Sequence, residues 1–445
     1  MSFFPRSSFP FSSCTPSWFA GHMARSLREL PPLLEDMNLV IEARDARLPL
    51  TSINPAFDGV LRKWKDRDKG RGVGRERLVV YTKRDLADAR LEGPLEKAFL
   101  QHGKQQIMFA DTRKDKDVSQ VLRHAVDLAR IHGPYTPTFS ILVLGMPNVG
   151  KSSLLNALRR VGIRKGKAFA TGAMAGVTKK LTGTVKIHED PDVYVYDTPG
   201  IMTPYLGAGQ DGQEKGLKLA LTVGIKEGLF DLEEMTDYLL WKMNRRLVSE
   251  PLFSPYLSVL SLPQNFLPTD HLPTFLSALS DRLAVKQKGG EPDWEAIMKW
   301  LLKHWRDGKL GEWTLDELVP YRQHSLSLKE DKIISTAETE DPNPSIAINE
   351  GSLDSQVSDT VARYFESLSS STSSILPNES KSASQQRKIN KNKRLREKDA
   401  KLRVKGIKVK KREEWLPGGM VGGRKRGLAP KSMMGAAGRA KRGRG

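Results

Sequence analysis

Cysteine is nearly absent from this chain of 445 residues, and its absence excludes two kinds of stabilising framework. The single cysteine, Cys14, cannot form an intramolecular disulfide and cannot build a cysteine-based zinc finger. Long apolar runs are also absent. No stretch approaches the roughly 18 residues that a membrane-spanning helix needs. A hydrophobic content of 38% and a charged content of 28% instead predict a soluble globular protein with two or three domains.

Acidic residues are scarce at both ends of the chain. The first acidic residue is Glu29, and the Ser- and Phe-containing start with Arg6 is typical of a mitochondrial import segment, which we assign to residues 1–17. Between residues 381 and 445, 23 Lys and Arg stand against 4 Asp and Glu, whereas the rest is balanced at 49 against 48. Dense positive charge without an apolar pattern predicts a disordered tail (385–445) that binds a polyanion such as RNA. A tail that only increases solubility is the alternative.

The first half of the chain predicts an α/β domain. Short apolar runs without alternation are typical of strands covered on both faces of a parallel sheet, and helical patterns separate them. The predicted strands are 39–43, 78–81, 107–109, 139–144 and 193–196. Residues 209–322 carry apolar residues at helical spacing without strand patterns, which predicts a small all-helical domain. Residues 323–384 are rich in Ser, Thr and acids, which predicts a disordered linker with one transient helical turn at 361–368.

A phosphate-binding loop follows the run 139–144. Its sequence is G-x-x-x-x-G-K-S, and the helical run behind it offers a helix N-terminus to the phosphates. In such a loop the backbone N–H groups wrap the phosphates, Lys151 reaches the β- and γ-phosphates, and the Ser152 hydroxyl binds Mg²⁺. We therefore assign Lys151 a catalytic role as well. The predicted contacts to the nucleotide in this loop are Asn148, Val149, Gly150, Lys151, Ser152 and Ser153.

Two further segments are expected to hold the metal and the γ-phosphate. Asp197 follows the run 193–196, and its carboxylate is expected to hold Mg²⁺ through water, while the Gly200 N–H senses the γ-phosphate. Thr178 lies in a Gly- and Ala-rich segment before Asp197. It is a candidate for the second hydroxyl ligand of Mg²⁺ and for a GTP contact, with an ordinary loop threonine as the alternative.

Guanine specificity is indicated by Thr82, Lys83 and Asp85, which follow the run 78–81. Guanine presents two adjacent donors, N1–H and N2–H₂, and the Asp85 carboxylate can accept both while the Lys83 stem covers the base. Thr82 replaces the usual Asn of this motif, and the companion motif at 109–111 is degenerate. Because adenine lacks the paired donors, we expect GTP rather than ATP, with an ATP-using enzyme as the alternative.

The order of the motifs is unusual, because the base-reading motif precedes the phosphate loop. Ordinary GTPases carry it after that loop. A circularly permuted Ras-like P-loop GTPase domain over residues 18–208 explains the order. The permutation places the switch segment 197–200 directly before the helical domain, so a change of nucleotide state could move that domain as a body.

With this order the chain resembles the circularly permuted YlqF/RbgA-type GTPases that assemble the large ribosomal subunit, and among them the mitochondrial members. The likeness covers residues 18–320. It is carried by four runs, WFAGHM at 18–23, DARLPL at 45–50, GLKLALT at 216–222 and RDGKLG at 306–311.

The resemblance implies a GTP hydrolase that binds the mitochondrial large ribosomal subunit and its rRNA through the helical domain and supports mitochondrial translation. It further implies a monomer in the mitochondrial matrix that associates peripherally with the inner membrane. Two alternatives stay open: a GTP-regulated RNA-binding module with negligible turnover, and a nucleolar pre-ribosome GTPase.

The resemblance also implies an unusual catalytic group. Ile201 stands where many GTPases place the Gln that orients water, and His22 matches the histidine proposed for that role in bacterial relatives. An anchor for the N-terminal segment is the alternative role of His22. Asn148 matches the Asn that ligates K⁺ in potassium-stimulated GTPases, so K⁺ is an expected second cation beside Mg²⁺. Arg47 is either a phosphate or rRNA contact or a structural ion pair. The helical-domain residues expected at rRNA are Lys215, Lys218, Lys226, Lys242, Arg245 and Arg246.

Overall fold

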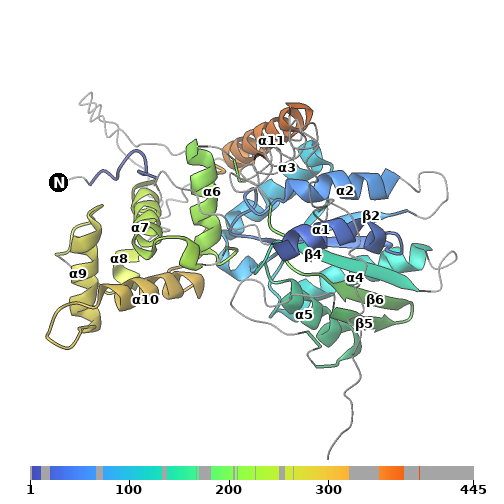
Figure 1. Ribbon diagram of the computed structural model, residues 1–445, viewed down its shortest axis with the longest axis horizontal. Helices are drawn as coiled ribbons and strands as arrows, with labels where there is room; N and C mark the ends of the chain where they lie inside the picture. The colour runs from blue at the N-terminus through green and yellow to red at the C-terminus, as the bar shows by residue number, and fades with distance from the viewer. Residues whose placement is uncertain are drawn as a thin grey trace, which may run out of the picture. The chain divides into compact units, whose positions relative to one another are not determined.

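A six-stranded sheet forms the centre of the α/β domain (Figure 1). The computed structural model describes residues 3–11, 21–66, 74–132, 138–166, 168–169, 182–203, 206–207, 209–225, 227–249, 256–263, 265–319, 350–374 and 390. The strand order is β3-β2-β1-β4-β6-β5, and only β5 runs antiparallel to its neighbour. The strands are β1 (Leu39–Asp45), β2 (Glu76–Thr82), β3 (Ile107–Ala110), β4 (Phe139–Gly145), β5 (Thr182–Glu189) and β6 (Asp192–Asp197). All five predicted strands are confirmed, and β5 is an addition to them.

Helices cover both faces of this sheet, which explains the uninterrupted apolar runs. Every residue of β1 is buried. Val40 of β1 packs with α1 and α2 on one face, whereas Ile41 packs with α4 and α5 on the other. The helices of this domain are α1 (Gly21–Leu34), α2 (Pro55–Asp66), α3 (Glu92–Gly103), α4 (Asp115–His132) and α5 (Lys151–Ile163).

The sheet order confirms the circular permutation. Strand β1 lies between β2 and β4 and is parallel to both, so the loops that follow β2 and β4 emerge at the same edge. Ligands of open α/β sheets bind at this carboxyl edge. The base-reading motif and the phosphate loop therefore meet in space although their order in the chain is reversed.

An all-helical domain follows the switch segment, as predicted. Its helices are α6 (Gly209–Leu221), α7 (Leu232–Ser249), α8 (Tyr256–Val259), α9 (Leu272–Leu283) and α10 (Trp294–Arg306). Leu239, Phe275 and Trp305 are almost fully buried in its core. None of the helices in the described part of the chain is long and apolar enough to cross a membrane.

Helix α11 (Glu350–Ser374) corrects the predicted disordered linker. Figure 1 shows α11 beside α3, and the two helices share a hydrophobic cluster in which Val357 and Val361 are fully buried. The ion pair between Lys97 Nζ and Asp354 Oδ2 (2.6 Å) also joins α11 to α3. The linker prediction is wrong for residues 350–374, because apolar side chains at helical spacing find a partner helix far away in sequence. Of the predicted basic tail only residue 390 is described.

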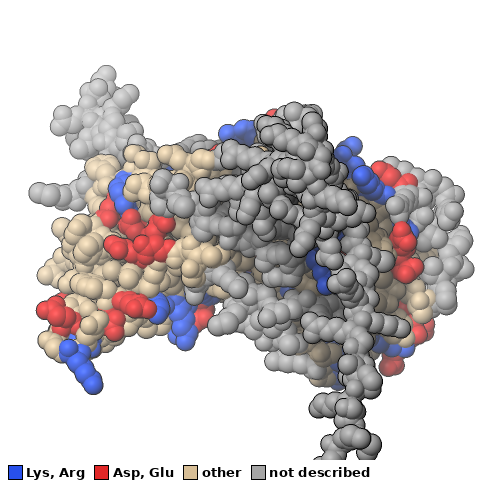
Figure 2. All heavy atoms as spheres, in the orientation of Figure 1, with Lys and Arg blue, Asp and Glu red and all other residues tan. Residues whose placement is uncertain are grey.

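Charges of both signs are interspersed on the face of the described residues shown in Figure 2. This distribution agrees with the near balance of Lys and Arg against Asp and Glu ahead of residue 381.

Candidate nucleotide-binding site

The phosphate loop has the backbone geometry that its glycines predict. It joins the end of β4 at Gly145 to the start of α5, and Asn148 (φ 56°) and Gly150 (φ 96°) adopt positive φ angles. A side chain at Gly145 would place its Cβ 2.4 Å from the Ala43 carbonyl oxygen, so only glycine fits. This turn presents the N-terminus of α5 to the carboxyl edge of the sheet, where a phosphate would gain from its free N–H groups.

Lys151 is the first residue of α5 and folds back over the loop. Its Nζ donates hydrogen bonds to the carbonyl oxygens of Gly145 (3.3 Å) and Met146 (2.8 Å). Burial lowers the pKa of Lys151 to about 8. A bound phosphate would restore full charge to this ammonium group, because a nearby negative charge favours the protonated form.

Ser152 and Asp197 lie together where the metal is expected. The Ser152 hydroxyl donates to Asp197 Oδ2 at 2.9 Å, while the buried Asp197 Oδ1 has no hydrogen-bond partner among the described residues. Burial raises the pKa of Asp197. A cation would satisfy this oxygen and return the carboxylate to its charged form. Mg²⁺ prefers such oxygen ligands together with water and phosphate oxygens, so this pair fits it.

The switch segment packs directly on the phosphate loop. A Cβ at Gly200 would lie 2.6 Å from Pro147 Cα, and the Ile201 N–H donates to the Gly145 carbonyl oxygen at 3.1 Å. The Ile201 side chain is 1% exposed and lies in the hydrophobic cluster formed with α1 and α2. Asn54 fixes the same residue by donating from Nδ2 to the Ile201 carbonyl oxygen (2.8 Å). Ile201 thus anchors the switch in the core.

Thr82 links the base-reading motif to the phosphate loop. It is fully buried at the end of β2, and its hydroxyl lies 3.0 Å from the Arg44 carbonyl oxygen and within hydrogen-bond distance of the Val149 carbonyl oxygen. The Thr that stands in place of the usual Asn thus contacts the phosphate loop. Both hydroxyl contacts of Thr82 are to backbone carbonyl oxygens of the protein.

Asp85 lies just beyond β2, in the short 3-10 helix Arg84–Leu86. Burial and the nearby Asp111 raise the pKa of Asp85, and Arg113 forms an ion pair with its Oδ2. Arg113 follows β3, and its side chain is 72% exposed. The sequence prediction missed this arginine, because nothing in the degenerate motif at 109–111 indicates which neighbour faces Asp85. A guanine base would exchange the Arg113 contact for its own two donors.

Three comparisons relate this chain to known GTPases. A family model described as "50S ribosome-binding GTPase" matches residues 140–247. Mitochondrial ribosome-associated GTPase 1 of Mus musculus is 36% identical over 232 residues, which cover 51% of this chain and 67% of the mouse protein. Mitochondrial GTPase 1 of Schizosaccharomyces pombe is 32% identical over 341 residues, which cover 72% of this chain and 94% of the yeast protein. The chain belongs to the mitochondrial ribosome-associated GTPase 1 family.

Among solved structures, GNP-bound YlqF from T. maritima is 19% identical and covers 64% of this chain and 95% of its own, with a TM-score of 0.37. The strand order and the motifs of this mitochondrial ribosome-associated GTPase 1 family member establish its permuted fold.

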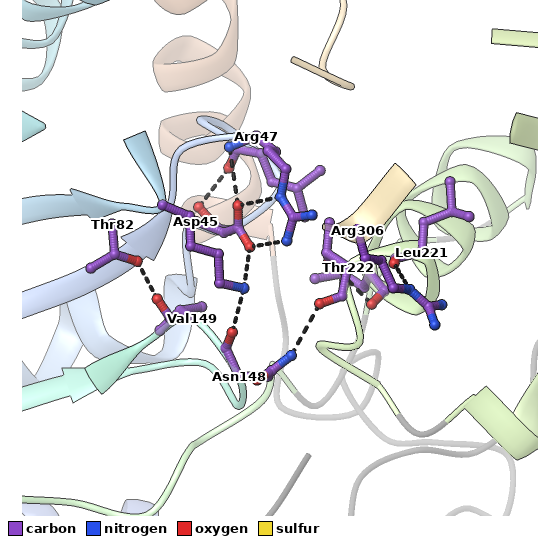
Figure 3. A network of polar contacts seen from close by, with 12 residues as sticks. Asp45, Arg47, Thr82, Asn148, Val149, Leu221, Thr222 and Arg306 are labelled. Carbon is purple, nitrogen blue, oxygen red and sulfur yellow. Dashed lines mark hydrogen bonds and ion pairs between the residues drawn. The ribbon is translucent and has the colours of Figure 1, made fainter. Parts of the chain in front are cut away.

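A buried ion-pair network joins the two halves of the nucleotide site in this family member (Figure 3). Lys83 Nζ lies 2.8 Å from Asp45 Oδ2 and 2.6 Å from the Asn148 carbonyl oxygen. Arg47, 3% exposed, pairs with Asp45 (Nη2–Oδ2 2.8 Å) and stacks over the Trp305 ring at 5.1 Å. Burial opposes the charge of Asp45, but Arg47 and Lys83 outweigh it and lower the pKa of Asp45. Of the two roles left open for Arg47, the structure supports the structural ion pair.

The phosphate loop also contacts the helical domain. Asn148 Nδ2 donates to the Thr222 carbonyl oxygen at 3.3 Å, directly beyond the end of α6. Arg306 of α10 fixes the same helix end, since its Nε donates to the Leu221 carbonyl oxygen (2.7 Å) and its Nη2 to that of Ala220 (3.3 Å). Figure 3 shows the Asn148 side chain directed toward Thr222. The loop that binds phosphate is thereby linked to two helices of the second domain.

Several basic residues expected at rRNA are instead held within the protein. Lys218 pairs with Asp316 (3.3 Å), and Lys242 pairs with Glu317 (2.7 Å), both as buried side chains. Arg245 pairs with Glu317 as well, at 2.7 Å. These ion pairs engage the three side chains within the protein, so the structure gives the assignment to rRNA no support at these positions. Their acidic partners could not be recognised from the sequence pattern.

Other predicted site residues lie partly or wholly outside the described part of the chain. Thr178 and Lys226 are not described, and neither is the side chain of His22. Ser153 lies beside Ser152 in the first turn of α5. The structure brings together Lys151, Ser152, Asp197 and Gly200 at the phosphate end of the site.

Proposed function

We propose that this protein binds the mitochondrial large ribosomal subunit and promotes its assembly, hydrolysing GTP to GDP and phosphate. The observation that carries the proposal is the hydrogen bond between Asn148 of the phosphate loop and Thr222 of the helical domain. A nucleotide that rearranges the loop changes this contact, so its state is transmitted to the domain that faces the ribosome. The mouse relative is named for association with the mitochondrial ribosome, which supports the partner.

Different residues of the site bind the base, the phosphates and the metal ion of GTP. Asp85 accepts the guanine donors, and the loop backbone at Asn148, Val149 and Gly150 cradles the phosphates. Lys151 exchanges its two carbonyl partners for phosphate oxygens. Ser152 and Asp197 hold Mg²⁺, which neutralises charge on the β- and γ-phosphates, and Thr178 completes its ligands.

Hydrolysis requires a water-positioning group other than the residue after Gly200. Ile201 is buried in the core, so we assign the water to His22, which stands in the first turn of α1. Helix α1 reaches the same hydrophobic cluster as Ile201 through Leu30 and Leu34. His22→Ala should therefore abolish turnover stimulated by large-subunit particles while GTP affinity stays unchanged. Normal stimulated turnover in this variant would remove His22 from the mechanism.

A potassium ion is the second proposed element of catalysis. The Nδ2 of Asn148 is engaged with Thr222, so its Oδ1 is the atom of this amide that can ligate K⁺. We expect faster turnover in KCl than in NaCl at equal ionic strength, and Asn148→Ala should remove the difference. Equal rates in both salts would exclude the ion.

The proposed partner is tested by crosslinking the protein to RNA in cells and sequencing the attached fragments. We expect rRNA of the mitochondrial large subunit, with contacts from exposed basic residues of the helical domain and from the tail. Cytosolic or nucleolar pre-rRNA would favour the nucleolar alternative, and recovery of no RNA would contradict the proposal. A variant without residues 385–445 separates the contribution of the tail.

The proposed location is the mitochondrial matrix, with a peripheral position on the inner membrane and a monomeric protein. Fluorescence microscopy of a C-terminally tagged protein tests the compartment, and a purely nucleolar signal would overturn it. Carbonate extraction tests peripheral attachment, and sedimentation of the purified protein tests the monomer.

A further inference from the structure

Residues 3–11 fold against the helical domain. Figure 1 shows residues 3–11 beside α7. Phe9 is only 4% exposed, and Pro5 is buried as well. These residues belong to the stretch whose composition is typical of an import segment, a kind of segment that is removed in many mature proteins.

Arg6 makes the polar contacts of this segment. Its guanidinium donates two hydrogen bonds to Asp237 of α7, at 2.7 Å to Oδ1 and 3.0 Å to Oδ2. Its backbone N–H donates to Asp270 Oδ2 (2.5 Å), and its carbonyl oxygen accepts from Trp241 Nε1 (2.8 Å). A two-pronged pair of this kind fixes both the position and the direction of the segment.

Phe9 makes the apolar contacts. Its ring lies edge-on to Tyr238 at a centroid distance of 5.3 Å and 5.7 Å from the Trp241 ring, and Phe11 packs at 5.1 Å. The Arg6 guanidinium lies 5.6 Å above the same Phe9 ring. The segment thus presents an Arg-x-x-Phe pattern, one residue for the carboxylates and one for the aromatic surface.

The surface that receives this segment is organised by contacts of its own. Asn244 Nδ2 donates to Asp270 Oδ1 (2.8 Å), which aims the opposite carboxylate oxygen at Arg6. The Tyr238 hydroxyl donates to Glu214 (2.8 Å), and Arg245 stacks over the Trp241 ring at 4.8 Å. Removal of residues 3–11 would uncover these aromatic rings and leave Asp237 without its arginine.

We propose that residues 3–11 remain on the working protein as an N-terminal clasp, which joins α7 to the segment before α9. Arg6 and Phe9 are its two attachment points. The clasp concerns the fold of the helical domain and does not depend on the proposed ribosomal function. If the same stretch directs import, it does so as a signal that is kept after delivery.

The first experiment measures hydrogen exchange of residues 3–11 in the purified full-length protein. We expect protection of this segment, and its loss to the level of an unstructured peptide in Arg6→Glu and in Asp237→Arg. The double variant, which exchanges the two charges, should recover protection. Phe9→Ala should lose protection and lower the thermal midpoint, whereas the exposed Ser7→Ala should behave as wild type. Unchanged GTP affinity shows that the variants remain folded.

The second experiment determines the N-terminal sequence of the protein isolated from its native cells. We expect an N-terminus ahead of Arg6. An N-terminus beyond Phe11, or rapid exchange of residues 3–11 in the wild-type protein, would overturn the clasp. The compartment from which the protein is recovered is a separate result, so failure of the proposed location is distinguishable.

Discussion

Replacing Ile201 with Gln should destabilise the protein without accelerating hydrolysis. A comparison of motifs alone predicts the opposite result, faster hydrolysis, because Gln at this position orients the attacking water in many GTPases. The side chain of Ile201, however, is 1% exposed and packs with Leu30, Leu34 and Phe57. A Gln in this place would bury an amide in an apolar cluster.

The expected loss of stability in Ile201→Gln has two contributions. Burial of an isoleucine side chain stabilises by about 1.5–3 kcal/mol, which the polar Gln side chain largely forfeits. Each buried amide group without a partner adds a cost of about 1–3 kcal/mol. We therefore expect Ile201→Gln to lower the free energy of unfolding by about 3–5 kcal/mol. Ile201→Val, the matched control, should cost about 0.5–1.5 kcal/mol.

Urea denaturation of the GDP-bound protein measures these losses, and phosphate release measures turnover on the same samples. A Gln variant of wild-type stability would refute the packing argument. A Gln variant that hydrolyses GTP faster would show that this side chain turns toward the phosphates in the GTP state.

Four further outcomes test individual contacts of the site. In the nucleotide-free protein Lys151 releases its proton near pH 8, whereas the unfolded chain keeps it up to the ordinary pKa of 10.5. The free energy of unfolding of the nucleotide-free protein should therefore rise between pH 8 and 10.5, and Lys151→Met should remove this rise. Asp85→Asn should weaken GTP binding by about two orders of magnitude in equilibrium titrations, because two charge-assisted hydrogen bonds are lost, and an unchanged affinity would contradict the guanine assignment. Gly200→Ala should weaken GTP binding more than GDP binding. The new Cβ would lie 2.6 Å from Pro147 Cα and would displace the backbone N–H that is expected to contact the γ-phosphate. Val361→Asp should detach α11 and speed hydrogen exchange in α3, whereas the exposed Glu366→Ala should not.

Local patterns in the sequence were sufficient for the central sheet and the phosphate loop. The five predicted strands are confirmed because uninterrupted apolar runs arise wherever helices cover both faces of a sheet. The permutation was predictable because the positions of Asp85, Lys151 and Asp197 along the chain fix the order in which the strands enter the sheet.

Partners distant in sequence explain what the sequence could not reveal. Helix α11 lies in a Ser-rich stretch, and its contacts with α3, about 250 residues away, and with Leu318 hold it on the α/β domain. In the sequence Lys218 has the character of an rRNA contact, and its pairing with Asp316 arises only from the fold. Arg113 reaches Asp85 from a neighbouring loop, and no sequence motif indicates this contact. In each case the chemistry of the residue was evident and its neighbour was not.

Turnover of the full-length protein with and without purified mitochondrial large-subunit particles tests the central claim most directly. The phosphate loop is bonded to the helical domain through Asn148 and Thr222, so engagement of that domain should accelerate GTP hydrolysis. Small-subunit particles serve as the control and should have no effect. Equal turnover with and without large-subunit particles would contradict the account and favour a GTP-regulated RNA-binding module.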